Sequence, residues 1–227
     1  MSFNLSQKPI EQRRFIYSLF VPVLLLELMI AILLIGDLND FNLSKFGIRP
    51  RVVESWWGIF TSPLIHGSWG HLGSNAPSFL VLFSTLLYFY REIGYRVFLW
   101  IYILSGVIVW CIGRDSWHIG ASGLVYGMAS FLFFSGVIRQ SVQLMAISLM
   151  VIFLYGSMIW GIFPLSPKLP YSWEAHLGGS IIGVALSVIY RHLGPQRVVK
   201  VWDETDDEVD QDNVGDEEVE LEKDSDE

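Results

Sequence analysis

The chain has 227 residues, of which 52% are hydrophobic, and a formal net charge of −8 at neutral pH. Its mean hydropathy of +0.44 excludes an ordinary soluble domain and predicts an all-α polytopic membrane protein. The single cysteine, Cys111, excludes an intrachain disulfide.

Six apolar segments are candidate membrane-spanning helices, since such a helix needs roughly 20 mostly apolar residues. They are residues 15–35, 72–90, 97–111, 122–138, 142–163 and 175–190. Two are short or contain polar residues, so six is the best count rather than the only one. The first segment is too long for a signal peptide and lacks a small-residue cleavage site after it. We therefore expect one membrane domain over residues 15–192, after an N-terminal segment of residues 1–14.

Charge predicts the orientation, because an even number of spans places both termini on one side. Nine positive residues then share the side of the termini: Lys8, Arg13, Arg14, Arg91, Arg96, Arg139, Arg191, Arg197 and Lys200. Five lie on the other side: Lys45, Arg49, Arg51, Arg114 and Lys168. The positive-inside rule predicts cytoplasmic termini in a multi-pass protein of the cell membrane. We expect the lipid bilayer as a partner and no nucleic acid.

The connection between the first two spans, residues 36–71, is long and rich in aromatic residues. Loops of this length are usually functional or partly structured, and this one is expected to lie in the membrane interface with short helices. The chain has no internal repeat, which weakens an inverted-repeat transporter as an interpretation.

A polar cluster lies where this loop meets the second span. His71 and Asn75 are four residues apart, so they share one face of a helix, and both can donate hydrogen bonds. They could also be a structural pair that pins a helix. His66 and His71 suggest a metal only weakly, because their spacing does not fit one helix face and no carboxylate or thiol lies nearby. Pro77 predicts a kink or an irregular start in this span.

Ser122 opens the fourth span, between Gly120 and Gly123. A hydroxyl in hydrocarbon costs free energy unless it has a polar partner. At a helix N-terminus, unpaired backbone N–H groups favour negative charge, so an oxyanion could be held there. Taken alone, such a string is more often packing between membrane helices.

His176 opens the last span and is followed by Gly179 and Gly183, small residues that let helices pack tightly. Alone, such a histidine is more often structural than catalytic. Close packing could bring it within hydrogen-bond distance of Ser122, as nucleophilic catalysis requires. Glu174 could tune the imidazole, but we favour a carboxylate that reaches the aqueous interface.

Residues 193–227 form a C-terminal extension that begins with a basic juxtamembrane stretch. Residues 203–227 carry 15 Asp and Glu against one Lys. Such a composition predicts a disordered, solvated tail. A solubilising role is favoured over a regulatory or partner-binding one.

Three motifs together resemble the rhomboid family of intramembrane serine proteases. They are His66-x4-His71-x3-Asn75, Gly120-Ala-Ser122-Gly123-x2-Tyr126-Gly127 and Ala175-His176-x2-Gly179-x3-Gly183. The resemblance covers about residues 15–192 and implies a six-transmembrane-helix bundle with a long membrane-associated first loop. It implies an endopeptidase that cleaves transmembrane segments of membrane proteins without a cofactor or metal.

The same resemblance implies a role for each matching residue. Ser122 would be the nucleophile and His176 the general base. His71, Asn75 and the Ser122 amide would stabilise the oxyanion. Tyr126 would pack on the imidazole, and His66 would line the water-filled side of the site.

One departure in the first loop and two alternatives accompany the resemblance. The family's first loop often carries a Trp-Arg pair, whereas this chain has Trp57-Gly58, which puts the anchoring of the loop in doubt. A non-catalytic, rhomboid-like protein that binds membrane helices would keep the fold. The presence of Ser122 and His176, with Ala121 rather than proline before the serine, argues against it. A transporter or channel would also place polar residues within spans.

Overall fold

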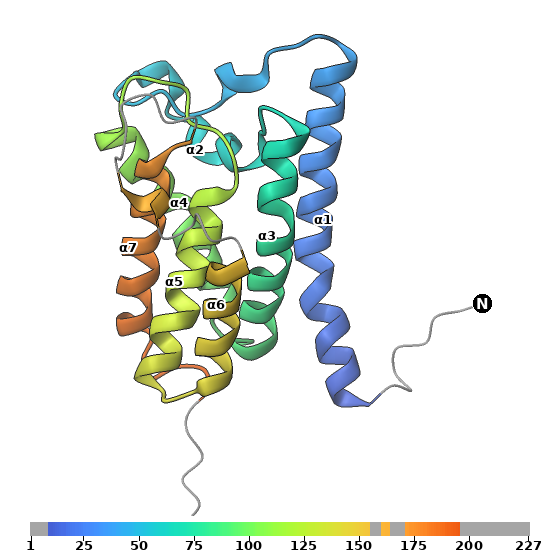
Figure 1. Ribbon diagram of the computed structural model, residues 1–227, viewed down its shortest axis with the longest axis vertical. Coiled ribbons are helices and arrows are strands. Elements are labelled where there is room, and N and C mark those ends of the chain that lie inside the picture. The colour runs from blue at the N-terminus through green and yellow to red at the C-terminus, as the bar shows by residue number, and fades with distance from the viewer. Residues whose placement is uncertain (1–8, 155–159, 164–170, 196–227) are drawn as a thin grey trace, which may run out of the picture. The chain divides into compact units, whose positions relative to one another are not determined.

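The computed structural model describes residues 9–154, 160–163 and 171–195, and their regular elements are helices (Figure 1). The six longer helices are α1 (Ile10–Leu38), α3 (Trp69–Phe89), α4 (Gly94–Ile112), α5 (Ser122–Ile138), α6 (Val142–Leu154) and α7 (Trp173–Ile189). The short ones are η2 (Leu43–Phe46), η3 (Val53–Ser55), α2 (Gly58–Thr61), η4 (Ser62–Leu64) and η5 (Trp160–Ile162).

Each of the six apolar segments contains a helix, although one segment differs from the prediction. Residues 142–163 were expected to form one span, but the described part of α6 ends at Leu154 and residues 160–162 form the separate 3-10 helix η5. Residues 155–159 and 164–170 lie outside the described part of the chain, as do residues 1–8 and most of the C-terminal extension, residues 196–227.

In the described part of the chain, three helices, α1, α3 and α4, are long and apolar enough to cross a membrane. The helices α5 and α7 are apolar but have 17 residues each. At a rise of about 1.5 Å per residue such a helix is roughly 25 Å long, near the lower limit for a span. These apolar helices indicate an integral membrane protein.

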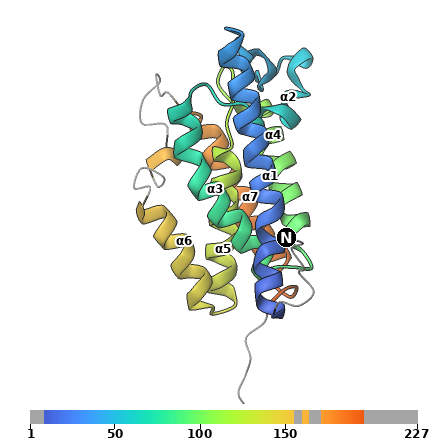
Figure 2. The ribbon, with the colours of Figure 1, turned by 90° about the vertical axis from the view of Figure 1, so that its right-hand side faces the viewer.

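Helix α5 is the most buried of the long helices and packs most extensively on α7. It also contacts α3, α4 and α6, and Figure 2 shows α6 lying beside α5. Phe131 and Leu132 of α5 are fully buried, together with Phe79 and Leu82 of α3. The N-terminus of α5, where Ser122 lies, is therefore set by contacts with several helices.

Small residues explain the close approach of α5 and α7. A methyl group on Gly179 would overlap the carbonyl oxygen of Gly123, and one on Gly183 would overlap that of Gly127. Only glycine permits the two backbones to lie this close, as the sequence predicted for Gly179 and Gly183.

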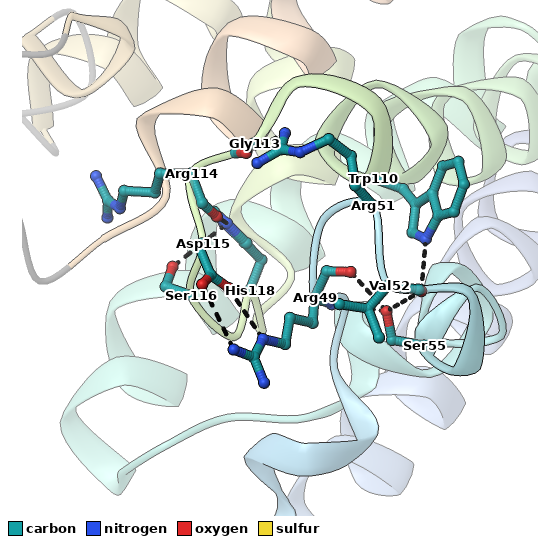
Figure 3. A network of polar contacts seen from close by, with 10 residues as sticks. All are labelled: Arg49, Arg51, Val52, Ser55, Trp110, Gly113, Arg114, Asp115, Ser116 and His118. Carbon is teal, nitrogen blue, oxygen red and sulfur yellow. Dashed lines mark hydrogen bonds and ion pairs between the residues drawn. The ribbon is translucent and has the colours of Figure 1, made fainter.

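Residues 39–68, between α1 and α3, contain the short helices η2, η3, α2 and η4. Ile48 pairs with His118 in an isolated antiparallel bridge, with N···O distances of 3.0 and 2.8 Å. The Arg49 guanidinium binds Asp115 at 2.9 Å, and Arg51 donates to the Gly113 carbonyl at 2.8 Å (Figure 3). This segment is therefore fastened to the connection between α4 and α5.

The second span does not start irregularly at Pro77, which was one of the two outcomes expected from this proline beside a kink. Helix α3 begins at Trp69, where the Ser68 hydroxyl caps it by accepting from the His71 amide at 3.1 Å. The helix then continues through Pro77 to Phe89. The fixed φ of proline is compatible with a helix, and the cap has fixed the start two turns earlier.

Candidate active site

Ser122 and His176 lie in contact although they are 54 positions apart in the chain. Ser122 is the first residue of α5, and His176 is in the first turn of α7. The distance between His176 Nε2 and Ser122 Oγ is 2.8 Å, which is a hydrogen bond. The close α5–α7 packing therefore brings a hydroxyl and an imidazole together.

The second nitrogen of His176 fixes the direction of that bond. His176 Nδ1 lies 2.9 Å from the carbonyl oxygen of Gly161. A carbonyl only accepts, so Nδ1 carries the proton. In the neutral ring Nε2 is then an acceptor, and Ser122 donates to it. A backbone carbonyl thus orients the imidazole as a carboxylate does in a Ser-His-Asp triad.

Two aromatic rings stack on the His176 imidazole and fix its orientation. The Tyr126 ring is stacked on His176 with a centroid distance of 4.1 Å and an interplanar angle of 6°, as the resemblance implied. The Tyr171 ring is also nearly parallel to it, at 5.5 Å and 13°. Sequence reasoning missed Gly161 and Tyr171, because both lie in connections and carry no motif.

His71 and Asn75 lie against the glycine that precedes the site. Gly120 has a φ of +108°, a conformation that side chains rarely adopt. A methyl group there would lie 2.7 Å from the His71 ring and 3.9 Å from the Asn75 amide nitrogen. The Gly120 amide donates to the Ser62 carbonyl at 2.8 Å. These contacts place two side-chain donors beside the residue that lies two positions before Ser122.

The Ser122 amide adds a backbone donor. Within α5, the Leu124 and Val125 amides donate to the Ala121 carbonyl, at 3.0 and 3.1 Å. The Ser122 and Gly123 amides come before Leu124, the first amide that donates to a carbonyl of this turn, so they point out of the helix N-terminus. The helix dipole adds positive potential at the same place.

His66 contacts both the residue before Ser122 and the His71 ring. Its Nε2 accepts from the Ala121 amide at 3.3 Å, and its ring lies edge-on to that of His71 at 5.0 Å. Burial, with the neighbouring His71, lowers the pKa of His66 to about 4, which favours the neutral ring that this bond requires. Only 2% of the residue is exposed, so it does not line an open, water-filled side as expected.

Glu174 is buried, which corrects the expectation that it reaches the aqueous interface. It is 1% exposed, and its Oε1 accepts from the Arg114 amide at 3.1 Å. The α4–α5 connection folds over the start of α7 and supplies this donor. Within the described ranges, no group of three or more His, Cys, Asp or Glu side chains could hold a metal ion.

Known proteins are similar to this chain in sequence. The model of the Rhomboid domain matches residues 53–193. Uncharacterized proteins of Mycobacterium bovis and Mycobacterium tuberculosis are 34% identical to the chain over 179 residues, which cover 75% of this chain and 73% of each relative. An uncharacterized protein of Mycobacterium leprae is 31% identical over 191 residues, covering 79% of this chain and 73% of the relative. The family match, which covers more than half of the chain, shows that the chain belongs to the rhomboid family.

Proposed function

We propose that this protein is an intramembrane serine endopeptidase that cleaves transmembrane segments of other membrane proteins through a Ser122–His176 dyad. The observation that carries the proposal is the bond of 2.8 Å between His176 Nε2 and Ser122 Oγ, with Nδ1 held by the Gly161 carbonyl. Membership of the rhomboid family supports it. In a membrane helix, a hydroxyl bound to a correctly oriented imidazole is the arrangement of an activated nucleophile.

Acylation uses the tautomer found at His176. As Ser122 Oγ attacks the substrate carbonyl carbon, its proton moves to Nε2 and an imidazolium forms. Nδ1–H keeps donating to the Gly161 carbonyl, which stabilises the positive ring. The tetrahedral intermediate then collapses, Nε2–H gives its proton to the leaving amine, and the peptide bond breaks.

The oxyanion of that intermediate lies among three donors: the Ser122 amide, the His71 ring and the Asn75 side-chain amide. One Asn75 N–H group binds the His71 carbonyl at 3.1 Å. Its NH₂ group has two hydrogens, so the second is available to the oxyanion. Loss of one oxyanion donor typically lowers kcat by about 10²–10³.

Deacylation repeats the proton transfers with water. His176 Nε2 takes a proton from a water molecule, whose oxygen attacks the acyl-enzyme carbonyl. Collapse of the second intermediate returns the proton from Nε2 to Ser122 Oγ and releases the new carboxyl terminus. No cofactor or metal is required.

The proposal includes the membrane setting. Six spans over residues 15–192, with cytoplasmic termini, would place Ser122 and His176 toward the non-cytoplasmic side of the cell membrane. The same side would hold Arg49 and Arg51, in the connection between α1 and α3, and Arg114, in the connection between α4 and α5. The substrate is a membrane-protein segment that unwinds at the dyad, because a helical peptide bond is shielded from attack.

Labelling with a fluorescent fluorophosphonate tests the proposal in detergent-solubilised protein. We expect the wild type to be labelled, and the variants Ser122→Ala and His176→Ala to remain unlabelled. Circular dichroism should show that both variants keep the helicity of the wild type. Asn75→Ala should be labelled more slowly, because the phosphonyl oxygen loses one donor. Equal labelling of all variants would place the reactive group elsewhere. A folded wild type that stays dark would favour the non-catalytic membrane-helix binder.

A further inference from the structure

The position of the His176 ring depends on how the first turn of α7 is held. Ser172 caps this helix, because its hydroxyl accepts from the Ala175 amide at 3.2 Å. Its carbonyl accepts from the His176 amide at 3.2 Å. A displacement of Ser172 would therefore move the imidazole relative to Ser122.

His118 binds this capping residue. His118 Nδ1 lies 2.6 Å from Ser172 Oγ, and Nε2 lies 3.0 Å from the Arg114 carbonyl. The carbonyl only accepts, so Nε2 carries the proton. In the neutral ring, Nδ1 accepts from the Ser172 hydroxyl. Burial lowers the pKa of His118, which favours that neutral form.

Arg114 binds the chain on both sides of the cap. Its amide donates to Glu174 Oε1 at 3.1 Å, and its Nε lies 3.8 Å from the same oxygen. Its Nη2 donates to the Tyr171 carbonyl at 2.6 Å. Burying a carboxylate is costly unless it is paired, so Glu174 holds the α7 turn firmly against Arg114.

The segment that carries Arg114 and His118 also leads to the nucleophile. His118 is four residues before Ser122, and its backbone pairs with Ile48. Asp115 of the same segment pairs with Arg49, as Figure 3 shows. One connection thus sets the start of α5 and the start of α7 together.

We propose that Arg114, His118, Ser172 and Glu174, here named the Arg114 cluster, are positioning residues that hold His176 at hydrogen-bond distance from Ser122. This inference rests on the proposed protease function. Glu174 acts by accepting a hydrogen bond from the Arg114 amide, which fixes the position of the first turn of α7. It does not take the place of a triad aspartate, because Nδ1 of His176 is already bonded to the Gly161 carbonyl.

Inactivation kinetics with the fluorophosphonate test this role, using the full chain in detergent. Glu174→Ala should lower the inactivation rate constant roughly tenfold to a hundredfold, the scale for a misplacement near 1 Å, and leave the inhibitor constant unchanged. Glu174→Gln keeps an oxygen for the Arg114 amide, so it should recover to within about threefold of wild type. Asp115→Asn is the matched control and should equal wild type.

Ser172→Ala is a second variant that leaves no buried charge unpaired, and it should slow inactivation as Glu174→Ala does. Wild-type rates in both variants would overturn the inference while the proposed function stands. A Glu174→Gln variant as slow as Glu174→Ala, with a shifted pH profile, would assign Glu174 an electrostatic role on the imidazole and also overturn it. Equal losses in Asp115→Asn would show general damage to the connection and would likewise overturn the inference. A wild type that is not labelled overturns the proposed function, and this inference with it.

Discussion

Replacing Gly179 by alanine tests how strictly the dyad depends on the contact between α5 and α7. The new methyl group would overlap the Gly123 carbonyl oxygen and lie 3.0 and 3.2 Å from the Gly123 carbonyl carbon and the Gly127 amide nitrogen. All three atoms are backbone, so no side-chain rotation relieves the overlap. Ordinary contact begins at 3.4 Å, and α7 must move by about 1 Å or deform, which overpacking studies place at roughly 1–3 kcal/mol.

That movement acts directly on the dyad. Gly179 is one turn after His176, and Gly123 directly follows Ser122. A displacement near 1 Å would stretch the bond of 2.8 Å beyond hydrogen-bond distance. We expect the fluorophosphonate labelling rate to fall about a hundredfold, the loss typical of such a misplacement.

Gly178→Ala is the matched control for this prediction. Its methyl group would meet the Ile108 side chain at 2.9 Å, and a side chain can yield where backbone cannot. Both variants replace glycine by alanine, which has the higher helix propensity. The gain in helix stability is therefore similar in both and does not affect the comparison of their labelling rates. Labelling of Gly179→Ala at the wild-type rate would refute the reasoning, and equal losses in both variants would show that general packing is responsible.

Three further predictions concern protonation, stacking and stability. Activity should fall as the pH is lowered, because a protonated His176 cannot accept the serine proton; a labelling rate that rises in acid would contradict this. Tyr126→Phe keeps the stacked ring and should retain the labelling rate, whereas Tyr126→Ala should lose roughly tenfold, since such contacts contribute about 0.5–1.5 kcal/mol; equal rates in these two variants would argue against the role of the ring. Arg139, which is 6% exposed, donates to two carbonyls beyond the end of α7. Arg139→Leu should therefore lower the unfolding free energy by about 2 kcal/mol in thermal melts, while labelling in the cold is unchanged; an unaltered melting temperature would contradict that.

Local patterns in the sequence predicted the parts of the site that depend on helix geometry. Spacing of four residues placed His71 and Asn75 on one face of α3, and the structure brings both against Gly120. Glycines four residues apart predicted the close contact of α7 with α5. The stacking of Tyr126 on His176 followed from the family resemblance rather than from the pattern itself.

The remaining parts depend on connections whose paths no periodicity reveals. Gly161, whose carbonyl accepts a hydrogen bond from His176, lies in a short 3-10 helix within a segment that hydropathy assigned to one continuous span. Glu174 was expected to reach water, because a charge beside an apolar helix ordinarily does so. The structure buries it because residues 113–118 fold across the start of α7 and supply the Arg114 amide.

Cleavage in a bilayer tests the central claim most directly. Purified protein and Ser122→Ala would be reconstituted separately into liposomes with a panel of single-span reporter proteins, and the products would be identified by mass spectrometry. We predict cleavage by wild type at bonds within or next to the reporter's transmembrane segment, and none by Ser122→Ala. Intact reporters in the wild-type liposomes, with Ser122 still labelled by fluorophosphonate, would contradict the assignment as an intramembrane protease.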